Sequence, residues 1–307
     1  VVDEIATRAL VAEARPDVIF HAAAHKHVPL MEDHPSHAVE NNFFGTKSIA
    51  DAALASGVDR VVLISSDKAV NPTSVMGATK RLAERYVQGL NRRGDHATRC
   101  TMVRFGNVLG SACSVLPIWS AQLAEGAALT VTDPRMTRYF MTIGEAASLV
   151  VQSASLEGPP ETSGEIFLLD MGEPVRILEL AQRFVRSHGL APRVVAADGL
   201  GDVDGAHDPS SSNGEADDED RVDIVITGSR PGEKLHEELA LAAERIHPTP
   251  LDGIGAWVGA GDPPDLGTMV SELSAVRRAS DRAAVLRAIR AWVPEMAPPA
   301  PADIAAA

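Results

Sequence analysis

Three predominantly apolar runs in the first half of the chain predict buried strands. They are DVIFHAA at 17–23, VVLISS at 61–66 and TMVRF at 101–105. A strand that is apolar along its length is typical of a sheet covered on both faces. Apolar residues at helical spacing predict a helix from Pro35 to Ser56, which Gly57 ends, and another from Gly77 to Asn91. Strands and helices that alternate at this short spacing favour a parallel sheet.

The pattern becomes mixed after Asn107 and predicts a second, smaller lobe. Thr142 and Glu145 have the spacing of a capping box that opens a helix. We predict further helices at 115–125 and 177–188, and strands at 129–132, 165–169, 193–196 and 222–227. The acidic stretch 199–220 is poor in apolar residues and is interpreted as a disordered loop. The predicted division is 1–110, 111–250 and 251–307, the last holding C-terminal helices and a tail that is unordered from Ala297.

Charge and composition narrow the class of protein. A formal net charge of −14 argues against a nucleic-acid face, because phosphate binding needs clustered Lys and Arg. No run reaches the ~20 apolar residues needed to cross a bilayer. Cys100 and Cys113 lack CxxC spacing and are interpreted as reduced structural thiols of a cytosolic protein. The chain does not begin with Met and is interpreted as a fragment.

The stretch SSDK at 65–68 ends the second predicted strand and carries the first candidate chemistry. Open α/β sheets gather catalytic groups at the carboxyl ends of their strands, where Asp67 and Lys68 are expected to lie. A bare Ser-Asp-Lys is also a common polar turn, so the tripeptide alone leaves both interpretations open. Met76 and Lys80 lie four residues apart on the following predicted helix and can face the same crevice.

Six motifs in order across residues 17–239 carry a family resemblance. They are HAAAHKHVPLMEDHPSHAVENNFFGT, SSDKAVNPTSVMGATKR, VRFGNVLGS, MTRYFMT, GEIFLLDMGEPVRI and TGSRPGEKLHEEL. With them the chain resembles the polysaccharide-biosynthesis branch of the extended short-chain dehydrogenases/reductases, the UDP-N-acetylglucosamine 4,6-dehydratases. The inverting arm of this family has a tyrosine at the position of Met76. With methionine there, the chain resembles the long, non-inverting arm instead. The resemblance implies a Rossmann-like, doubly wound parallel α/β sheet lacking its first strands, with a smaller C-terminal mixed α/β substrate lobe.

The resemblance implies oxidation of the sugar at C4 by NAD+, loss of water across C5–C6 and return of the hydride to C6. Asp67 would donate a proton to the departing C6 hydroxyl, and Lys68 would remove the C5 proton. As a base, Lys68 is expected to have a pKa lowered by burial or by a second cation such as Lys80. Lys80 would also hold the nicotinamide ribose. The thioether of Met76 cannot accept the C4 hydroxyl proton, and Asp67 or a water held by Ser66 are the candidates.

The resemblance also implies the residues that hold the two ligands. The expected cofactor-binding residues are Ala22, Ala23, Ala24, Asn42, Ser65, Lys80 and Phe105. The expected substrate-binding residues are Lys26, His27, Asn107, Arg138, Arg230 and Glu233. A guanidinium and a carboxylate at positions 230 and 233 suit a diphosphate and a ribose. The histidines at 21, 25 and 27 have a spacing that could suggest a metal site, but the family needs no metal and no carboxylate completes the set.

The predicted function is therefore formation of UDP-2-acetamido-2,6-dideoxy-4-hexulose for a surface polysaccharide, by a cytosolic domain that forms a homo-oligomer. Membrane attachment would come only from an N-terminal region outside this chain. Another nucleotide-sugar epimerase or reductase, and a fragment that binds nucleotide sugar without turnover, are the alternatives. Strand 17–23 matches the family's fourth, and no glycine-rich pyrophosphate turn is found, so weak NAD+ binding is expected. Cys113 stands where the family usually has glycine.

Overall fold

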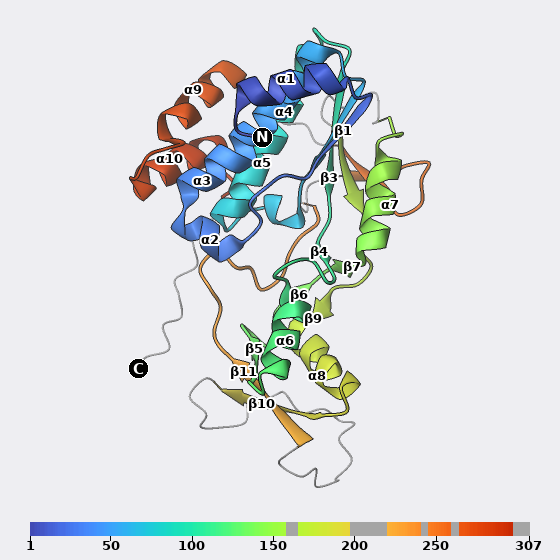
Figure 1. Cartoon of the computed structure of the whole chain (residues 1–307), viewed down its shortest axis with the longest axis vertical. Coiled ribbons are helices and arrows are strands. Elements are labelled where there is room, and N and C mark those ends of the chain that lie inside the picture. Colours follow the sequence, from blue (N-terminus) through green and yellow to red (C-terminus); the bar gives the residue numbers. More distant parts are fainter. Residues whose placement is uncertain (158–164, 197–219, 241–244, 259–263, 297–307) are drawn as a thin grey trace.

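The computed structural model describes residues 1–157, 165–196, 220–240, 245–258 and 264–296. Within these residues, a six-stranded sheet forms the larger part of the molecule and a three-stranded sheet forms a smaller lobe (Figure 1). Two short strand pairs lie between them: β4 (Asn107–Val108) with β7 (Phe140–Met141), and β6 (Thr137–Arg138) with β9 (Val175–Arg176).

The large sheet places the three strands predicted in the first half side by side. Its order is β1 (Val18–His21), β2 (Arg60–Ile64), β3 (Arg99–Arg104), β8 (Glu165–Leu169), β13 (Ile254–Val258) and β12 (Arg245–Pro248). The strands from β1 to β8 are parallel, and β13 is antiparallel to both of its neighbours. Because parallel strands end at the same edge of a sheet, the loops after β1, β2 and β3 meet there.

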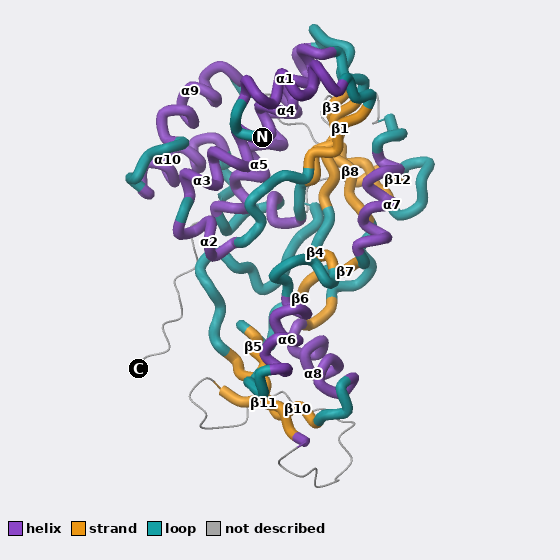
Figure 2. Tube along the Cα trace, viewed as in Figure 1, coloured by secondary structure: helices purple, strands orange, loops and turns teal. Residues whose placement is uncertain are grey.

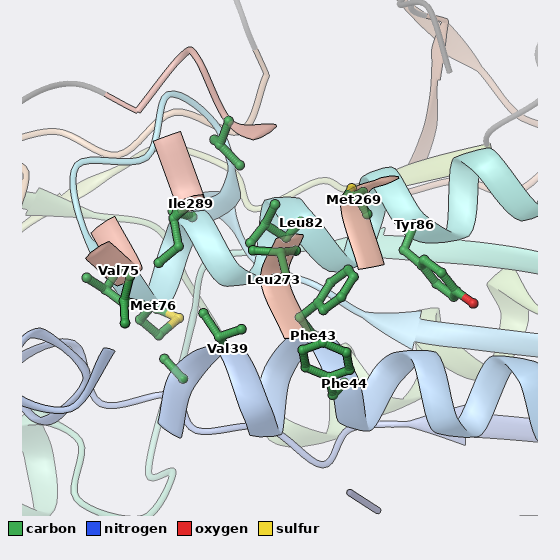
Figure 3. Packing of buried hydrophobic residues seen from close by; sticks show 14 of the residues in the cluster. Val39, Phe43, Phe44, Val75, Met76, Leu82, Tyr86, Met269, Leu273 and Ile289 are labelled. Atoms are coloured by element: carbon green, nitrogen blue, oxygen red, sulfur yellow. The ribbon is translucent and has the colours of Figure 1, made fainter. Parts of the chain in front are cut away.

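A group of helices covers one face of the large sheet. As predicted, residues 35–56 are helical throughout, although the run divides into α3 (Pro35–Ala38), a π-helical turn (Val39–Phe44) and α4 (Gly45–Ser56). Helices α1 (Glu4–Ala14) and α5 (Val75–Arg93) also pack on the sheet. An outer layer of α2 (Val28–Asp33), α9 (Leu266–Val276) and α10 (Arg282–Trp292) packs on these helices. Phe43, Leu82, Leu273 and Ile289 are fully buried in one cluster that joins α5 to the C-terminal helices (Figure 3).

Helix α7 (Ile143–Ser153) covers the opposite face. Val61 and Leu63 of β2 pack in the cluster on the α4 and α5 side, whereas Val62 packs in the cluster that contains α7. This alternation follows from the two-residue period of a strand. The predicted capping box opens α7 and is confirmed: Thr142 Oγ1 accepts the Glu145 N–H at 3.2 Å, and the Glu145 carboxylate accepts the Thr142 N–H at 2.8 Å.

The strand at 165–169 forms where predicted but in the other sheet. The predicted place of this strand in the smaller lobe is wrong, because β8 pairs with β3 in the large sheet. Ile166 and Phe167 pack on opposite faces and are both fully buried, as a central strand requires. The antiparallel strands β12 and β13 were not predicted. The division of the chain at 110 and 250 stays a prediction.

The smaller lobe is a parallel sheet with helices on one side. Its strands are β5 (Leu129–Val131), β11 (Arg221–Ile226) and β10 (Ala191–Ala196), with β11 in the middle. Helices α6 (Val115–Ala124) and α8 (Ile177–Ser187) pack on it, and Trp119 is fully buried between them and the sheet. Of the predicted disordered loop, residues 199–219 lie outside the described residues, as does the tail 297–307.

Residues 227–240 lead from the smaller lobe back to the large sheet and are here called the connecting segment. The segment contains no helix and no extended strand, and Figure 2 shows it as a loop. Thr73 Oγ1 donates a hydrogen bond to the Gly232 carbonyl at 2.9 Å, and Lys234 Nζ donates to the Val70 carbonyl at 2.7 Å. These contacts hold the connecting segment against the loop after β2.

Candidate active site

A cavity of about 480 Å³ opens where the strand ends of the large sheet face the smaller lobe. Its wall is built by the loops after β1, β2 and β3, the start of α5, strand β6 and the connecting segment. The ionisable residues in this wall are Lys26, His27, Lys68, Lys80, Cys113, Arg138, Arg230, Glu233, Lys234 and Glu237. A polar cavity at the carboxyl ends of parallel strands is the usual place for a ligand in an α/β fold.

A 3-10 turn at Asp67–Ala69 holds the two central candidates. Ser66 caps this turn by accepting the Lys68 N–H at 3.2 Å, and the Asp67 N–H donates to the Phe105 carbonyl at 3.0 Å. Helix α5 packs directly on the turn, because a Cβ atom added at Gly77 would overlap the Lys68 carbonyl oxygen. Glycine at position 77 therefore allows the backbone of Lys68 to touch the first turn of the helix.

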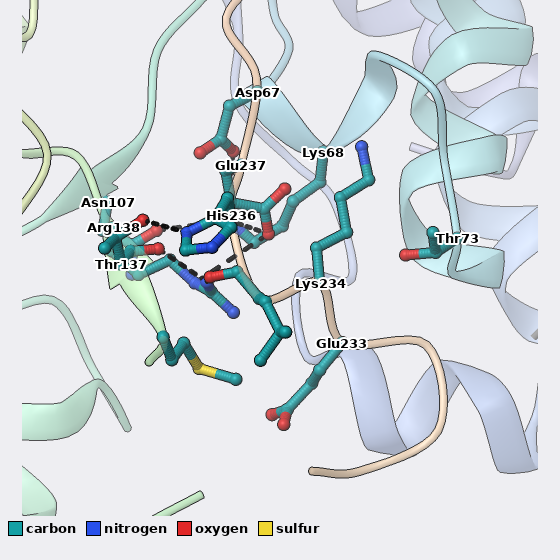
Figure 4. Close-up of polar contacts among 12 residues, drawn as sticks. Asp67, Lys68, Thr73, Asn107, Thr137, Arg138, Glu233, Lys234, His236 and Glu237 are labelled. Atoms are coloured by element: carbon teal, nitrogen blue, oxygen red, sulfur yellow. Dashed lines mark hydrogen bonds and ion pairs between the residues drawn. The ribbon is translucent and has the colours of Figure 1, made fainter. Parts of the chain in front are cut away.

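The ammonium group of Lys68 lies among three oxygen atoms (Figure 4). Its Nζ atom is 3.0 Å from Asp67 Oδ1, 3.2 Å from Asn107 Oδ1 and 3.6 Å from Glu237 Oε1. These partners come from the loop after β2, from β4 and from the connecting segment. The predicted neighbours Asp67, Lys68 and Asn107 are thus brought together, and Glu237 joins them.

The pKa of Lys68 is raised, which contradicts the expectation of a lowered value. Burial lowers this pKa, but the negative charges of Asp67 and Glu237 together outweigh burial. The cation that opposes them is Arg138, whereas Lys80 was expected in this role. At neutral pH, Lys68 is therefore an ammonium that must first pass its proton to a neighbour before it can act as a base.

Asp67 lies one layer behind the cavity wall. Its side chain is fully buried, and its Oδ1 atom accepts hydrogen bonds from Ser66 Oγ at 2.8 Å and from Lys68 Nζ. Its Oδ2 atom is buried without a hydrogen-bond partner among the described residues. A proton can thus travel between Asp67 and the cavity through the hydroxyl of Ser66 or the ammonium of Lys68, both of which line the wall.

Lys80 and Met76 lie on the face of α5 that lines the cavity, as their spacing predicts. The Lys80 ammonium donates to the Ile64 carbonyl at the end of β2 at 2.7 Å. Burial lowers the pKa of Lys80 to about 8, against the opposing charge of Glu84. The side chain of Met76 is almost completely buried and belongs to the core cluster of the helices, so it is both a wall residue and a core residue.

A buried ion pair between α5 and β3 supports this wall from behind. Arg104 Nε and Nη2 each donate at 2.8 Å to one of the two carboxylate oxygens of Glu84. Ser65 Oγ donates to the same carboxylate at 2.6 Å, and Arg81 Nη1 donates at 3.0 Å. Burial alone would raise the pKa of Glu84, but Arg104 and Arg81 lower it to about 2.

The predicted cofactor-binding residues divide into two groups. Ala22, Ala24, Ser65, Lys80 and Phe105 line the cavity. Ala23 and Asn42 are not in its wall. Asn42 instead holds the loop after β1, because its Oδ1 atom accepts the His25 N–H at 2.7 Å and its Nδ2 atom donates to the His25 carbonyl at 3.0 Å.

The three histidines considered for a metal site have separate surroundings. His21 is buried against Thr46 Oγ1 at 3.0 Å, and burial together with the charge of Lys80 lowers its pKa to about 4. His27 lines the cavity, and only the backbone of His25 is held by Asn42. Within the part of the chain that the structure describes, no group of three or more His, Cys, Asp or Glu side chains is placed to hold a metal ion.

All six predicted substrate-binding residues line the cavity: Lys26, His27, Asn107, Arg138, Arg230 and Glu233. Arg138 is buried and its Nη1 atom donates to the Leu235 carbonyl at 3.2 Å, which ties β6 to the connecting segment. Cys113 also lines the cavity and has a φ angle of +54°. This left-handed backbone is unfavourable for any residue with a Cβ atom, and the glycine that the resemblance implies at this position would avoid the strain.

Sequence reasoning missed Glu84 and Glu237. Glu84 follows Lys80 by four residues, so the helical spacing places it on the same face, but its partner Arg104 lies on a distant strand. Glu237 stands beside Glu238 in the motif KLHEEL, and no local pattern distinguishes them. Only the fold shows that Glu237 is buried whereas Glu238 is exposed.

The contact between Gly77 and Lys68 predicts a large difference between two glycine substitutions. Gly77→Ala is expected to destabilise the protein by about 2 kcal/mol, because the added methyl group meets backbone that cannot move freely. Gly144→Ala is the matched control, since Gly144 also lies in the first turn of a helix. Apart from its chain neighbours and its own helix backbone, no described atom lies within 4 Å of its added Cβ. This control is expected to stabilise by up to ~1 kcal/mol. Urea unfolding measures both, and equal effects would contradict the close contact.

No helix in the described ranges combines the length and the apolar character that a membrane span requires.

Comparisons with known proteins place the chain in a family. A family model described as polysaccharide biosynthesis protein matches residues 1–257. The chain is 44% identical over 284 residues to the probable polysaccharide biosynthesis protein EpsC of Bacillus subtilis. The matched region covers 91% of this chain and 42% of that protein. It is 32% identical over 236 residues to the UDP-N-acetylglucosamine 4,6-dehydratase (inverting) of Campylobacter jejuni serotype O:2, covering 76% and 58%. The chain therefore spans only about half of these relatives.

The solved structure of Pen from Bacillus thuringiensis has the same fold. It superposes with a TM-score of 0.64 at 31% identity, covering 81% of this chain and 68% of that one. The Rossmann-like parallel sheet predicted from the sequence is thereby confirmed. With the family model matching most of its length, this chain belongs to the polysaccharide biosynthesis protein family.

Proposed function

We propose that this chain catalyses nucleotide-sugar 4,6-dehydration, converting UDP-N-acetylglucosamine to UDP-2-acetamido-2,6-dideoxy-4-hexulose. The observation that carries the proposal is the position of Lys68, which lies in the cavity wall between Asp67 and Glu237. Elimination of water from a sugar needs a base for one proton and an acid for the leaving hydroxyl, and ammonium–carboxylate contacts can supply both. The similarity to the Campylobacter jejuni dehydratase (inverting) supports a 4,6-dehydration, and Met76 favours the non-inverting form of that reaction.

The wall on the β2 side fits the nicotinamide half of NAD. Lys80 donates one hydrogen bond, to the Ile64 carbonyl, and an ammonium has three N–H donors, so two can serve the hydroxyls of a ribose. The small side chains of Ala22 and Ala24 leave the backbone of the loop after β1 open to a flat ring. When bound, NAD+ supplies hydride transfer from C4 of the sugar and back to C6.

Other residues of the wall fit the nucleotide sugar. The guanidinium of Arg230 and the carboxylate of Glu233 suit the diphosphate and the uridine ribose. Lys26 and His27 come from the loop after β1 and offer further donors for phosphate or sugar oxygens. In this orientation the sugar ring lies toward Ser66, Lys68 and Asn107, which is where the reacting carbons C4, C5 and C6 need to be.

The chain offers a route for the C4 hydroxyl proton without a tyrosine. Ser66 Oγ lines the cavity and donates to Asp67 Oδ1 at 2.8 Å. Ser66 can therefore accept the C4 hydroxyl proton while it passes its own proton to Asp67. Asp67, now protonated, is the acid for the departing C6 hydroxyl, and Lys68 removes the C5 proton made acidic by the C4 ketone.

The test is incubation of the protein with UDP-N-acetylglucosamine and NAD+, followed by NMR of the sugar. NAD+ is added at a concentration that saturates the protein by calorimetry, because weak NAD+ binding is expected of this chain. A 4-keto-6-deoxy product with retained configuration at C5 is expected. Formation of UDP-N-acetylgalactosamine instead would identify a 4-epimerase. If calorimetry shows binding of the nucleotide sugar and NMR shows no new sugar, the chain is a binding module and the proposal is wrong.

A further inference from the structure

Glu237 is a buried carboxylate in the cavity wall beside Lys68, and none of the proton transfers assigned above to Ser66, Asp67 and Lys68 uses it. Its side chain is 4% exposed, and its Oε1 atom is 3.6 Å from Lys68 Nζ and 3.9 Å from Arg138 Nε. Its Oε2 atom is buried and has no hydrogen-bond partner among the described residues. A buried carboxylate that is only partly satisfied costs stability, so its retention in a catalytic wall points to a use in the reaction.

The role of Glu237 follows from counting the protons that the proposed dehydration moves, so it rests on that proposed function. Lys68 begins as an ammonium, so it must lose one proton before it can remove the proton from C5. The C4 hydroxyl must lose a second proton during oxidation. Because Met76 replaces the tyrosine, the reaction needs two proton acceptors besides Lys68. The two carboxylates that face Lys68 among the described residues are Asp67 and Glu237.

The hydrogen bonds divide these two tasks. Asp67 is connected to Ser66, which is the route for the C4 hydroxyl proton, and one carboxylate cannot take both protons. We infer that Glu237 accepts the ammonium proton of Lys68 and holds it during turnover. The Lys68 Nζ–H bond breaks and a Glu237 Oε1–H bond forms, so an ion pair becomes a neutral pair with no change in net charge. Closing the separation from 3.6 Å to the ~2.9 Å of a hydrogen bond requires only a side-chain adjustment.

The remaining steps then balance. Lys68 takes the proton from C5, and Asp67 gives its proton to the C6 hydroxyl, which leaves as water. After hydride returns to C6, Lys68 delivers its proton to C5, and Glu237 returns the stored proton to Lys68. Bound substrate favours the proton transfer from Lys68 to Glu237. It excludes water from the cavity, and the loss of water destabilises an ion pair more than a neutral pair.

The charged groups that face Lys68 are Asp67, Glu237 and Arg138, and Arg138 opposes the two carboxylates. Removing the charge of Glu237 therefore has a definite sign: the pKa of Lys68 falls. Glu237 acts through Lys68, so it is a positioning residue and proton store, and its effect on the rate is expected in the pH profile.

The experiment compares Glu237→Gln with Glu238→Gln, the exposed neighbour that accepts a hydrogen bond from Asn71 at 2.7 Å. The wild type and Glu238→Gln are expected to show little change in turnover between pH 6 and pH 8. In Glu237→Gln, Lys68 must release its proton to solvent, so turnover is expected to be at least about tenfold lower at pH 7 and to rise about tenfold per pH unit. Glu237→Asp keeps the charge and is expected to have a lower rate with a flat profile. A flat profile for Glu237→Gln, or a steep one for Glu237→Asp, would overturn the inference.

A second measurement needs neither cofactor nor turnover. Competitive acetylation of the free protein across a pH series, read by mass spectrometry of the peptide that contains Lys68, reports the pKa of this lysine. The midpoint is expected at lower pH in Glu237→Gln and unchanged in Glu238→Gln. An unchanged midpoint in Glu237→Gln would overturn the inference even if the wild type is a dehydratase. Absence of dehydration by the wild type would instead overturn the proposed function.

Discussion

Replacing Lys68 by alanine is expected to reduce product formation by about 10²- to 10⁴-fold, the usual contribution of a general acid–base group. Lys68 contacts Asp67, Asn107 and Glu237, and the proposed reaction places the reacting carbons of the sugar beside these residues rather than the diphosphate. UDP affinity is therefore expected to stay nearly unchanged. Initial rates measured by NMR and UDP affinity measured by calorimetry separate the two effects.

Lys47→Ala is the control for this substitution. Lys47 forms ion pairs with Asp51 and Glu4 outside the cavity wall, so its loss should leave the rate and the UDP affinity intact. A loss of UDP affinity as large as the loss of rate in Lys68→Ala would mean that Lys68 binds the nucleotide rather than the reacting carbons.

The second large effect is on stability, at the buried pair of Glu84 and Arg104. Glu84→Gln is expected to lower the free energy of unfolding at pH 7 by about 3 kcal/mol, because it removes the negative charge that the buried Arg104 guanidinium contacts. Asp95→Asn, which breaks the exposed pair with Arg93, is expected to change little. Urea unfolding of both variants measures the difference.

This effect depends on pH in a direction that the pKa of Glu84 fixes. The pKa lies near 2 in the folded protein and near 4.5 when unperturbed, so the folded state binds this proton less readily than the unfolded state. The stabilisation is therefore complete above about pH 5 and is lost as the pH falls toward 2. The difference between the wild type and Glu84→Gln should shrink over this range. A difference that stays constant down to pH 3 would contradict the assigned pKa.

Local sequence patterns predicted most elements of this fold, because each depends on neighbours within one helix or strand. The capping box of Thr142 and Glu145 is an interaction over three residues, and it forms as expected. The lobe to which 165–169 belongs is decided by pairing with β3, some sixty residues earlier, and no local pattern carries that information.

The same limit applies to the site. The strand-end rule and helical spacing placed Lys68, Met76 and Lys80 around one cavity. The charge state of Lys68, however, depends on Glu237, which arrives from about 170 residues further along the chain. The resemblance assigned Asn42 to cofactor binding, which stays a prediction. Its two hydrogen bonds to the backbone of His25 depend on a fold that places position 42 beside position 25, so no local pattern could show them.

The connecting segment is expected to unfold separately from the two sheets that it joins. Arg230, Glu233 and Glu237 all lie on a stretch that three side-chain hydrogen bonds fasten to the loop after β2. The stretch forms no strand ladder, only a single β-bridge between His236 and Thr137. Such a stretch can open by sub-global unfolding while the sheets on either side keep their hydrogen bonds. The proposed activity would then be lost at a lower denaturant concentration or temperature than the secondary structure of the sheets. A nucleotide sugar that bridges the stretch and the strand ends would oppose this opening by mass action, so that substrate completes the site it occupies.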